Sequence, residues 1–229
     1  MALVDNGTRL CHIVDRDPSI VTVFNRFGIK LGVGDKRISD VCVELHLDAA
    51  FFATILNVYL NEEYFPERIL STFSAATIVG YLRKTNRYYT CFQLPNIERH
   101  FNLLMQRSDH SGNLPLIRGF FNEVKAELES RIATDERQWF PEILDMERSV
   151  GHYGDVEMTP ASFDDGHDTV EDKIDDLTNM LVRHLDGDYD LNLCNAVVLA
   201  VFTLKRDIMK NNRIRYRLLQ PLSNLMSNN

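Results

Sequence analysis

Two segments of the chain carry polar residues at a spacing suited to metal chemistry. They are Arg131-x-x-x-Asp135-Glu136 leading into Phe140-Pro141, and Asn211-x-x-x-Arg215 leading into Gln220-Pro221. In a helix, residues four apart lie on one face, so a histidine and a glutamate at this spacing would offer a nitrogen and a carboxylate to iron. Arginine, aspartate and asparagine hold these places instead. The pattern therefore indicates a fold more directly than an activity.

The bulk composition is that of an ordinary globular protein. The 229 residues suffice for one large domain, or for a small domain joined to a medium one, and 45% of them are apolar and 25% charged. Residues 1–17 contain no apolar stretch of a secretory signal, and no run approaches the roughly 20 apolar residues of a membrane span. The net charge of -8 argues against non-specific binding to nucleic acid or anionic membranes.

The cysteines favour a reducing compartment. All four are far apart in the sequence and none forms a Cys-x-x-Cys pair, which is typical of reduced thiols rather than of a disulfide framework or a zinc site: Cys11, Cys42, Cys91 and Cys194. The seven histidines are also scattered, without a pair four residues apart. We therefore expect a cytoplasmic protein.

Short helices are predicted at the N-terminus. Asp17 as N-cap, Pro18 at the first helical position and Gly28 after the end punctuate a helix over 19–27. Asp48 is expected to cap a further helix, whose apolar stripe consists of Phe51, Phe52, Ile55, Leu56 and Tyr59. Residues 61–68 are interpreted as a linker, so a small helical domain is predicted over 1–65 and a second domain over 66–229.

Four longer helices are predicted in the second domain. They are expected over 74–106 with a kink at Pro95, from the N-cap Asn113 to near Pro141, over 169–184, and over 192–220. Residues 150–168 are interpreted as a long surface connection between the second and third helices. Connections that are short, long and short predict an all-α, up-down-up-down four-helix bundle.

Charge supports neighbouring positions for the last two helices. Acidic residues cluster between Asp164 and Asp176, and basic residues cluster between Lys205 and Arg217. Antiparallel neighbours would set the two clusters side by side. The basic run is therefore interpreted as a partner of the acidic helix rather than as a nucleic-acid surface.

The order of these pieces resembles the RIC family of di-iron proteins that repair iron-sulfur clusters. That family joins a small N-terminal domain to a hemerythrin-like four-helix bundle. The residues that carry the resemblance are Ile13-Val14, Asp17-Pro18, Val23-Phe24 through Phe27-Gly28-Ile29, Lys36 to Val41, Leu94-Pro95, Asp135-Glu136 to Phe140-Pro141, and Cys194 with the helix ending at Pro221. The resemblance covers most of the chain.

The resemblance also implies where metal ligands would stand, and no histidine is found there. The family's Cys-Cys-Gly-Gly element corresponds to Leu31-Gly32-Val33-Gly34-Asp35, so the thiol pair is absent. The six former-ligand positions are Arg87, Arg131, Asp135, Asp172, Asn211 and Arg215. Arginine cannot lose its proton to become a ligand, and each arginine near an iron would add Coulomb repulsion of roughly 4 kcal/mol per pair. We therefore expect no di-iron cofactor.

These replacements predict a buried network of salt bridges and hydrogen bonds in the volume that iron would occupy. The function expected from the resemblance is that of a non-metal pseudo-hemerythrin. It would be a regulatory or stress-related module that binds an unidentified protein partner or a small ligand, and a homodimer is compatible with the resemblance. No phosphate-binding glycine loop, Gly-x-Ser-x-Gly element or Cys-His pair indicates an enzyme.

Two other functions compete with this expectation. One is a di-iron or other metal-binding protein for cluster repair or iron storage, with shifted ligands drawn from Asp135, Glu136, Glu171, Asp172 and His184. The other is a nucleic-acid binder that uses the basic run 205–217. The net charge opposes the latter, which is ranked last.

Overall fold

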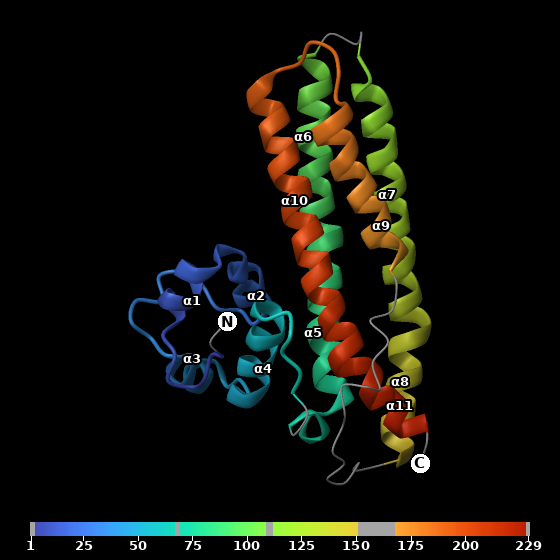
Figure 1. The fold of residues 1–229 in the computed structure, drawn as a ribbon. Coiled ribbons are helices and arrows are strands. Elements are labelled where there is room, and N and C mark those ends of the chain that lie inside the picture. The colour runs from blue at the N-terminus through green and yellow to red at the C-terminus, as the bar shows by residue number, and fades with distance from the viewer. Residues whose placement is uncertain (1–2, 67–68, 109–111, 151–167, 228–229) are drawn as a thin grey trace. The chain divides into compact units, whose positions relative to one another are not determined.

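The computed structural model describes residues 3–66, 69–108, 112–150 and 168–227, and this part of the chain is predominantly helical (Figure 1). Within these ranges no strand is formed, and Arg9 and Arg37 make an isolated antiparallel bridge. None of the described helices is long and apolar enough to cross a membrane. The all-α prediction is confirmed. The connection predicted over 150–168 falls, apart from its two ends, outside the described residues.

The chain divides into two compact units. Unit one comprises Met1–Thr85, Pro141–Asp165 and Lys210–Asn229, and unit two comprises Asn86–Phe140 and Gly166–Met209. The unit boundaries cut through long helices, so each unit gathers segments that are distant in sequence. The predicted division into 1–65 and 66–229 follows the order of the chain and stays a prediction.

Unit one contains the N-terminal helices and parts of longer ones. Its elements are α1 (Leu10–Arg16), η1 (Pro18–Ile20), α2 (Val21–Arg26), α3 (Ile38–Leu45), α4 (Ala49–Leu60), η2 (Leu70–Thr72), α5 (Ala75–Tyr88) up to Thr85, α8 (Phe140–Val150) from Pro141, α10 (Leu191–Ile214) from Lys210, η7 (Arg215–Leu219) and α11 (Gln220–Ser227). Asp17 accepts a hydrogen bond from the Ser19 backbone, and Gly28 adopts a φ of 76°. Asp48 caps α4 through the Phe51 backbone. The predicted N-terminal caps are confirmed.

Aromatic side chains join the N-terminal helices to α5 within unit one. The Phe27 ring lies 4.7 Å from that of Phe52 and 5.4 Å from that of Tyr81, measured between centroids. Arg26 is buried, and its Nη1 donates to the Tyr81 hydroxyl at 3.2 Å. Such aromatic contacts add about 0.5–1.5 kcal/mol per pair to the burial of the rings. The stripe predicted on α4 is buried in this core.

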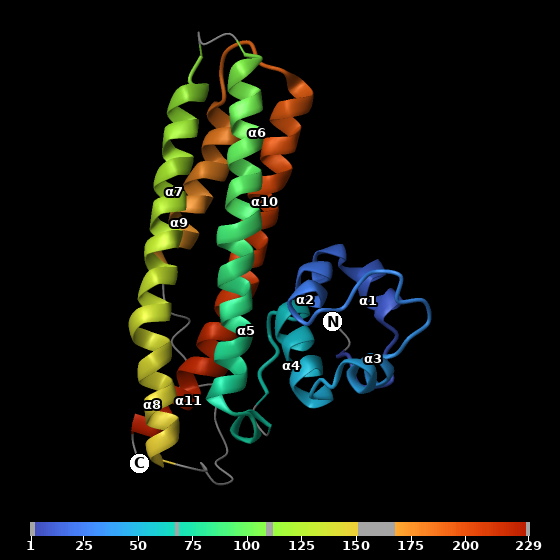
Figure 2. The same cartoon turned by 180° about the vertical axis from the view of Figure 1, so that it is seen from behind.

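Unit two packs four helices around one apolar core. Its elements are the end of α5, the π-helical segment η3 (Tyr89–Gln93), α6 (Leu94–Gln106), α7 (Leu114–Thr134), the π-helical segment η4 (Asp135–Trp139), α9 (Thr169–Asn179), the π-helical segment η6 (Met180–His184) and α10 (Leu191–Ile214) up to Met209. Figures 1 and 2 show α6, α7, α9 and α10 side by side. Their buried side chains form one cluster, with Phe101 and Phe121 stacked at 5.1 Å.

Three of the long helices contain a π-helical segment directly before an X-Pro pair. The residues preceding Pro95, Pro141 and Pro221 each donate a backbone hydrogen bond to the fifth residue before them. Proline in a helix interior lacks a donor and clashes with the carbonyl four residues earlier, at a cost of about 3 kcal/mol or more. The wider π turn removes the carbonyl from the ring. These helices therefore continue through their prolines.

This continuation corrects two predicted helix ends. The helix expected to end near Pro141 continues to Val150, and the one expected to end at Gln220 continues to Ser227. Asn113 precedes α7 but makes no side-chain cap. Its amide instead donates to the His184 carbonyl and accepts from the Asp186 backbone, which ties α7 to the end of η6. The predicted helix over 169–184 is confirmed as α9 and η6, with Asp168 as its cap.

Candidate functional site

The three prolines define equivalent positions on three helices. Ten residues before Pro95, Pro141 and Pro221 stand Thr85, Arg131 and Asn211, and six residues before them stand Tyr89, Asp135 and Arg215. Arg131 is partly buried, and the other five are buried. In each helix the first residue of the π segment, which is Tyr89, Asp135 or Arg215, is buried and carries a polar group. We call these six the proline-frame positions.

Arg131 forms a buried ion pair within unit two. Its Nη1 donates to Asp168 Oδ2, and only 13% of the Arg131 side chain and 5% of the Asp168 side chain are exposed. The other carboxylate oxygen of Asp168 accepts from the Val170 backbone at 2.9 Å and caps α9. One carboxylate therefore both starts α9 and neutralises the arginine on α7. The sequence reasoning missed Asp168 as the partner.

A second polar contact lies on the neighbouring turn of unit two. Asn86 is buried, and its amide donates to Glu136 Oε1 at 3.2 Å. Asp135, the residue before Glu136, is itself buried. Buried carboxylates and amides of this kind are retained in helical cores when their hydrogen-bonding groups are satisfied. The end of α5 is thereby joined to η4.

Two former-ligand positions are contradicted by the structure. Arg87 is exposed, because successive helical residues turn by about 100° and Asn86 and Tyr89 occupy the inward face of this turn. Asp172 is also exposed, because Val170 and Ile174 face the core of unit two. Neither side chain belongs to a buried network. Both residues lie on the outward faces of their helices.

Asn211 and Arg215 lie on the part of α10 and on η7 that belong to unit one. Both are buried, and they are one turn apart on the same side of the helix. Asn211 Oδ1 has no hydrogen-bond partner among the described residues. An unsatisfied buried amide oxygen costs about 1–3 kcal/mol, so it is a point at which a water or ligand would be stabilised. The network that was predicted to join these residues to Arg131 and Asp135 stays a prediction.

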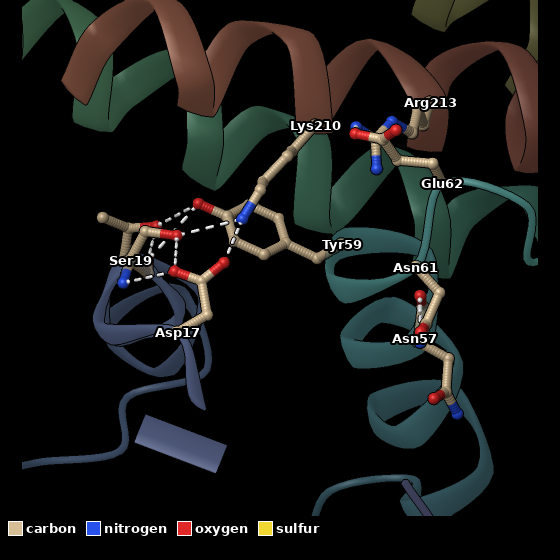
Figure 3. A network of polar contacts seen from close by, with 9 residues as sticks. Asp17, Ser19, Asn57, Tyr59, Asn61, Glu62, Lys210 and Arg213 are labelled. Carbon is tan, nitrogen blue, oxygen red and sulfur yellow. Dashed lines mark hydrogen bonds and ion pairs between the residues drawn. The ribbon is translucent and has the colours of Figure 1, made fainter. Parts of the chain in front are cut away.

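A connected polar cluster of unit one surrounds Lys210, one residue before Asn211 (Figure 3). Its Nζ pairs with Asp17 Oδ2, donates to Ser19 Oγ at 3.1 Å and lies 4.4 Å from the centroid of the Tyr59 ring. The Tyr59 hydroxyl donates to the Ser19 carbonyl at 3.3 Å. We call Asp17, Ser19, Tyr59 and Lys210 the lysine clamp.

The clamp sets the charge state of Asp17. Burial favours the neutral acid, but hydrogen bonds from Lys210 and Ser19 outweigh it and hold the pKa of Asp17 below its ordinary value. The lysine is 193 residues from Asp17, so no local sequence pattern indicates the pair. Its effect is to fasten η1 and α4 to the last turns of α10.

The basic run after residue 205 is largely engaged within the protein. Lys205 pairs with Asp175 on α9 at 2.8 Å, as the charge pattern predicted. Arg213 pairs instead with Glu62 at 2.9 Å, and Arg217 donates to the backbone carbonyls of Glu62 and Tyr64. The prediction that the whole run faces the acidic helix is therefore wrong for Lys210 and Arg213. These side chains hold the N-terminal helices.

The shifted metal ligands are not brought together. Among the described residues, no group of three or more histidine, cysteine, aspartate or glutamate side chains is placed to hold a metal ion. Asp172 and His184 are exposed and twelve residues apart on one continuous helix, which separates them by about 18 Å. Glu171 is partly buried, and Glu136 is the acceptor of the Asn86 amide. The alternative prediction that Asp135, Glu136, Glu171, Asp172 and His184 supply a metal site is therefore wrong for these described residues.

No family model and no curated protein matches the chain.

Proposed function

We propose that the chain is a non-metal pseudo-hemerythrin that works by binding a protein partner. In this proposal the long helices form an up-down-up-down bundle of the hemerythrin type, preceded by the small domain over 1–65. The role is regulatory or stress-related, takes place in the cytoplasm and needs no catalytic residue. The repeated π turn, X-Pro pair and inward polar position on three helices support a common ancestral site in those helices.

The observation that carries the proposal is the buried ion pair of Arg131 with Asp168. A guanidinium ion stands at a position where the resemblance implies an iron ligand, and its charge is neutralised by a carboxylate of the protein itself. Two iron ions in this volume would be repelled by Arg131 and would compete with it for Asp168. A site of this composition favours charge pairing over metal binding.

Metal analysis of protein purified from iron-replete cells tests the proposal. We expect iron far below one ion per chain, and an absorption spectrum without an oxo-bridge band. Near-stoichiometric iron with such a band would overturn the proposal in favour of the iron-binding alternative. Asp135→Asn is the matched control: iron held by ligands around η4 would fall in this variant, whereas adventitious surface iron would not change.

A further inference from the structure

Three pairs of an aspartate or asparagine followed by glycine occur in the sequence, and a pair of this kind can rearrange without an enzyme. They are Asn6-Gly7, Asp165-Gly166 and Asp186-Gly187. The glycine nitrogen can attack the side-chain carbonyl carbon of the preceding residue, because glycine has no side chain to obstruct the approach and takes up unusual backbone angles. The second pair falls outside the described residues. The other two pairs differ in where the fold directs the glycine nitrogen.

In the Asp186-Gly187 pair the nitrogen faces the carboxyl group of its own neighbour. The Gly187 backbone N–H donates to Asp186 Oδ1 at 2.8 Å, and the carbon to be attacked, Cγ, is one bond from that oxygen. Both residues are exposed, in the connection between η6 and α10, and Gly187 adopts a φ of 100°. Reacting groups that are held in contact react faster than groups that must first meet. The folded chain therefore presents this pair in a reactive arrangement.

In the Asn6-Gly7 pair the nitrogen is directed elsewhere. The Gly7 N–H donates to the carboxylate of Asp5 at 3.0 Å, and the Thr8 N–H donates to the Asp5 carbonyl at 3.0 Å. The Asn6 carbonyl accepts from the Ser39 backbone at 3.0 Å. These bonds must break before the Gly7 nitrogen can turn toward the Asn6 side chain, and such a local opening costs free energy. Folding therefore protects this pair.

Asp186 also lies where two connections of unit two pack backbone against backbone. Its N–H donates to Asn113 Oδ1 at 2.9 Å, and the Asn113 amide donates to the His184 carbonyl. A Cβ added to Gly112 would collide with the Asp186 carbonyl, so the two segments approach as closely as glycine permits. An extra backbone atom at Asp186 would have to displace these contacts.

We propose that Asp186 is a site of spontaneous isomerisation to isoaspartate, and that the product loosens this junction as the chain ages. After the carboxyl group takes a proton from solvent, the Gly187 nitrogen bonds to Cγ and loses its own proton, and the carboxyl hydroxyl leaves with that proton as water. A water molecule then opens the cyclic imide. Cleavage between the nitrogen and Cγ restores aspartate, whereas cleavage between the nitrogen and the Asp186 carbonyl carbon gives isoaspartate with a free α-carboxylate. No group is oxidised or reduced in either step.

Isoaspartate carries the peptide bond through its side chain. The backbone is therefore longer by one carbon atom, or about 1.5 Å, and the former Asp186 carbonyl becomes a carboxylate beside Gly112. Both changes disturb the hydrogen bonds of Asn113, so the α6–α7 connection should separate from the η6–α10 connection. The free α-carboxylate is the group that isoaspartyl methyltransferases methylate, and a repair enzyme of this class is the expected partner of an aged chain. This modification goes beyond the proposed function, because it occurs whether or not the chain binds another protein.

Ageing the full chain in parallel, folded and in guanidinium chloride, tests the inference because both samples have the same sequence. Both are kept in mildly acidic buffer at body temperature, and the product is located by peptide mass spectrometry and by an isoaspartyl methyltransferase with labelled S-adenosylmethionine. We expect isoaspartate at Asp186 to form in the folded chain at least as fast as in the unfolded chain. The reaction of Asn6 should be at least about tenfold slower in the folded chain. Equal slowing of both sites by folding, or no isoaspartate at Asp186, would overturn the inference.

Asp186→Glu is the matched variant, because a glutamate would have to close a six-membered ring, which forms far more slowly. Asp188→Glu, at a second exposed carboxylate of the same connection, is the control. Circular dichroism before ageing checks that both variants are folded. We expect ageing to lower the thermal unfolding midpoint of the wild type and of Asp188→Glu as isoaspartate accumulates, and to leave that of Asp186→Glu unchanged. An equal decrease in all three chains would refute the loosening of the junction by isomerisation.

Discussion

Replacing Lys210 by methionine should destabilise the protein through the loss of one buried ion pair. Methionine keeps most of the side-chain volume and removes the ammonium group. The Lys210 side chain is 11% exposed and that of Asp17 20%, so the pair is screened far less than a surface pair. The substitution therefore isolates the charge of the lysine clamp from its packing.

The expected magnitude follows from the three contacts of the ammonium group. The charge-assisted hydrogen bond to Asp17 contributes about 1.5–3 kcal/mol, and the bond to Ser19 Oγ contributes about 1 kcal/mol. The Tyr59 ring at 4.4 Å adds about 0.5–2 kcal/mol. The variant also avoids the cost of desolvating the ammonium group, which offsets part of this sum. We expect a net loss of about 2–4 kcal/mol in the free energy of unfolding.

A double-mutant cycle in urea separates the pair from its surroundings. Lys210→Met, Asp17→Asn and the double variant should give a coupling energy of about 1.5–3 kcal/mol. The control cycle uses Arg213→Met, on the same turns of α10 as Lys210, and Glu62→Gln, whose side chain is 79% exposed. It should give less than about 1 kcal/mol. Equal couplings in the two cycles, or a Lys210–Asp17 coupling below about 0.5 kcal/mol, would refute the reasoning.

The remaining predictions concern the response of Asp17 to acid, the loss of stability when single carboxylates are removed, and the order in which the cysteines react. The folded-state pKa of Asp17 lies below its ordinary value, so the ionised carboxylate stabilises the fold fully at pH values above that ordinary value. This stabilisation is lost as pH falls through the folded-state pKa. In urea unfolding, the difference in stability between wild type and Asp17→Asn should shrink over the same pH range. Asp168→Ala should cost about 3–5 kcal/mol and Asp172→Ala less than about 0.5 kcal/mol in the same assay, and similar losses would contradict the assignment of Arg131 to Asp168. Glu147→Ala should cost about 1–2 kcal/mol because this carboxylate accepts from the Ala75 and Ala76 backbone at 2.5 and 3.0 Å, and unchanged thermal stability would contradict that cap. Iodoacetamide should modify the exposed thiol of Cys91 before those of Cys42 and Cys194, whose pKa values burial raises, and peptide mass spectrometry would reveal the opposite order.

The local part of the fold could be predicted because its signals are local. Asp17-Pro18 and Asp48 each start a helix through a hydrogen bond to a backbone group two or three residues away, and both caps are present. The apolar stripe on α4 could be predicted because its residues repeat with the helical period, and the same repeat places them together on one buried face. By contrast, the lysine clamp joins residues 193 positions apart, and no periodicity encodes such a pair.

The helix ends were mispredicted where two local rules compete. Proline favours the end of a helix, and Pro141 and Pro221 were interpreted in this way. Each proline follows a residue whose backbone N–H donates to the carbonyl of the fifth residue before it. The widened turn lets the two helices continue beyond their prolines, to Val150 and Ser227. Whether proline stops a helix depends on the apolar residues behind it, and Ile143 and Leu222 are buried. Tertiary packing thus outweighs the local preference.

The error at Arg87 has a sharper cause, which is its distance from the proline of its helix. Arg131 and Asn211 stand ten residues before their prolines, whereas Arg87 stands eight before Pro95. Two residues on a helix correspond to a rotation of about 200°. Counted from its own proline, Arg87 therefore stands on the opposite face of its helix from the face that Arg131 and Asn211 occupy on theirs. Counting ten and six residues from Pro95 gives Thr85 and Tyr89, which are both buried. The proline in each of these helices is therefore a suitable origin for numbering its inward face, because the π turn fixes the rotation of the residues before it relative to the ring.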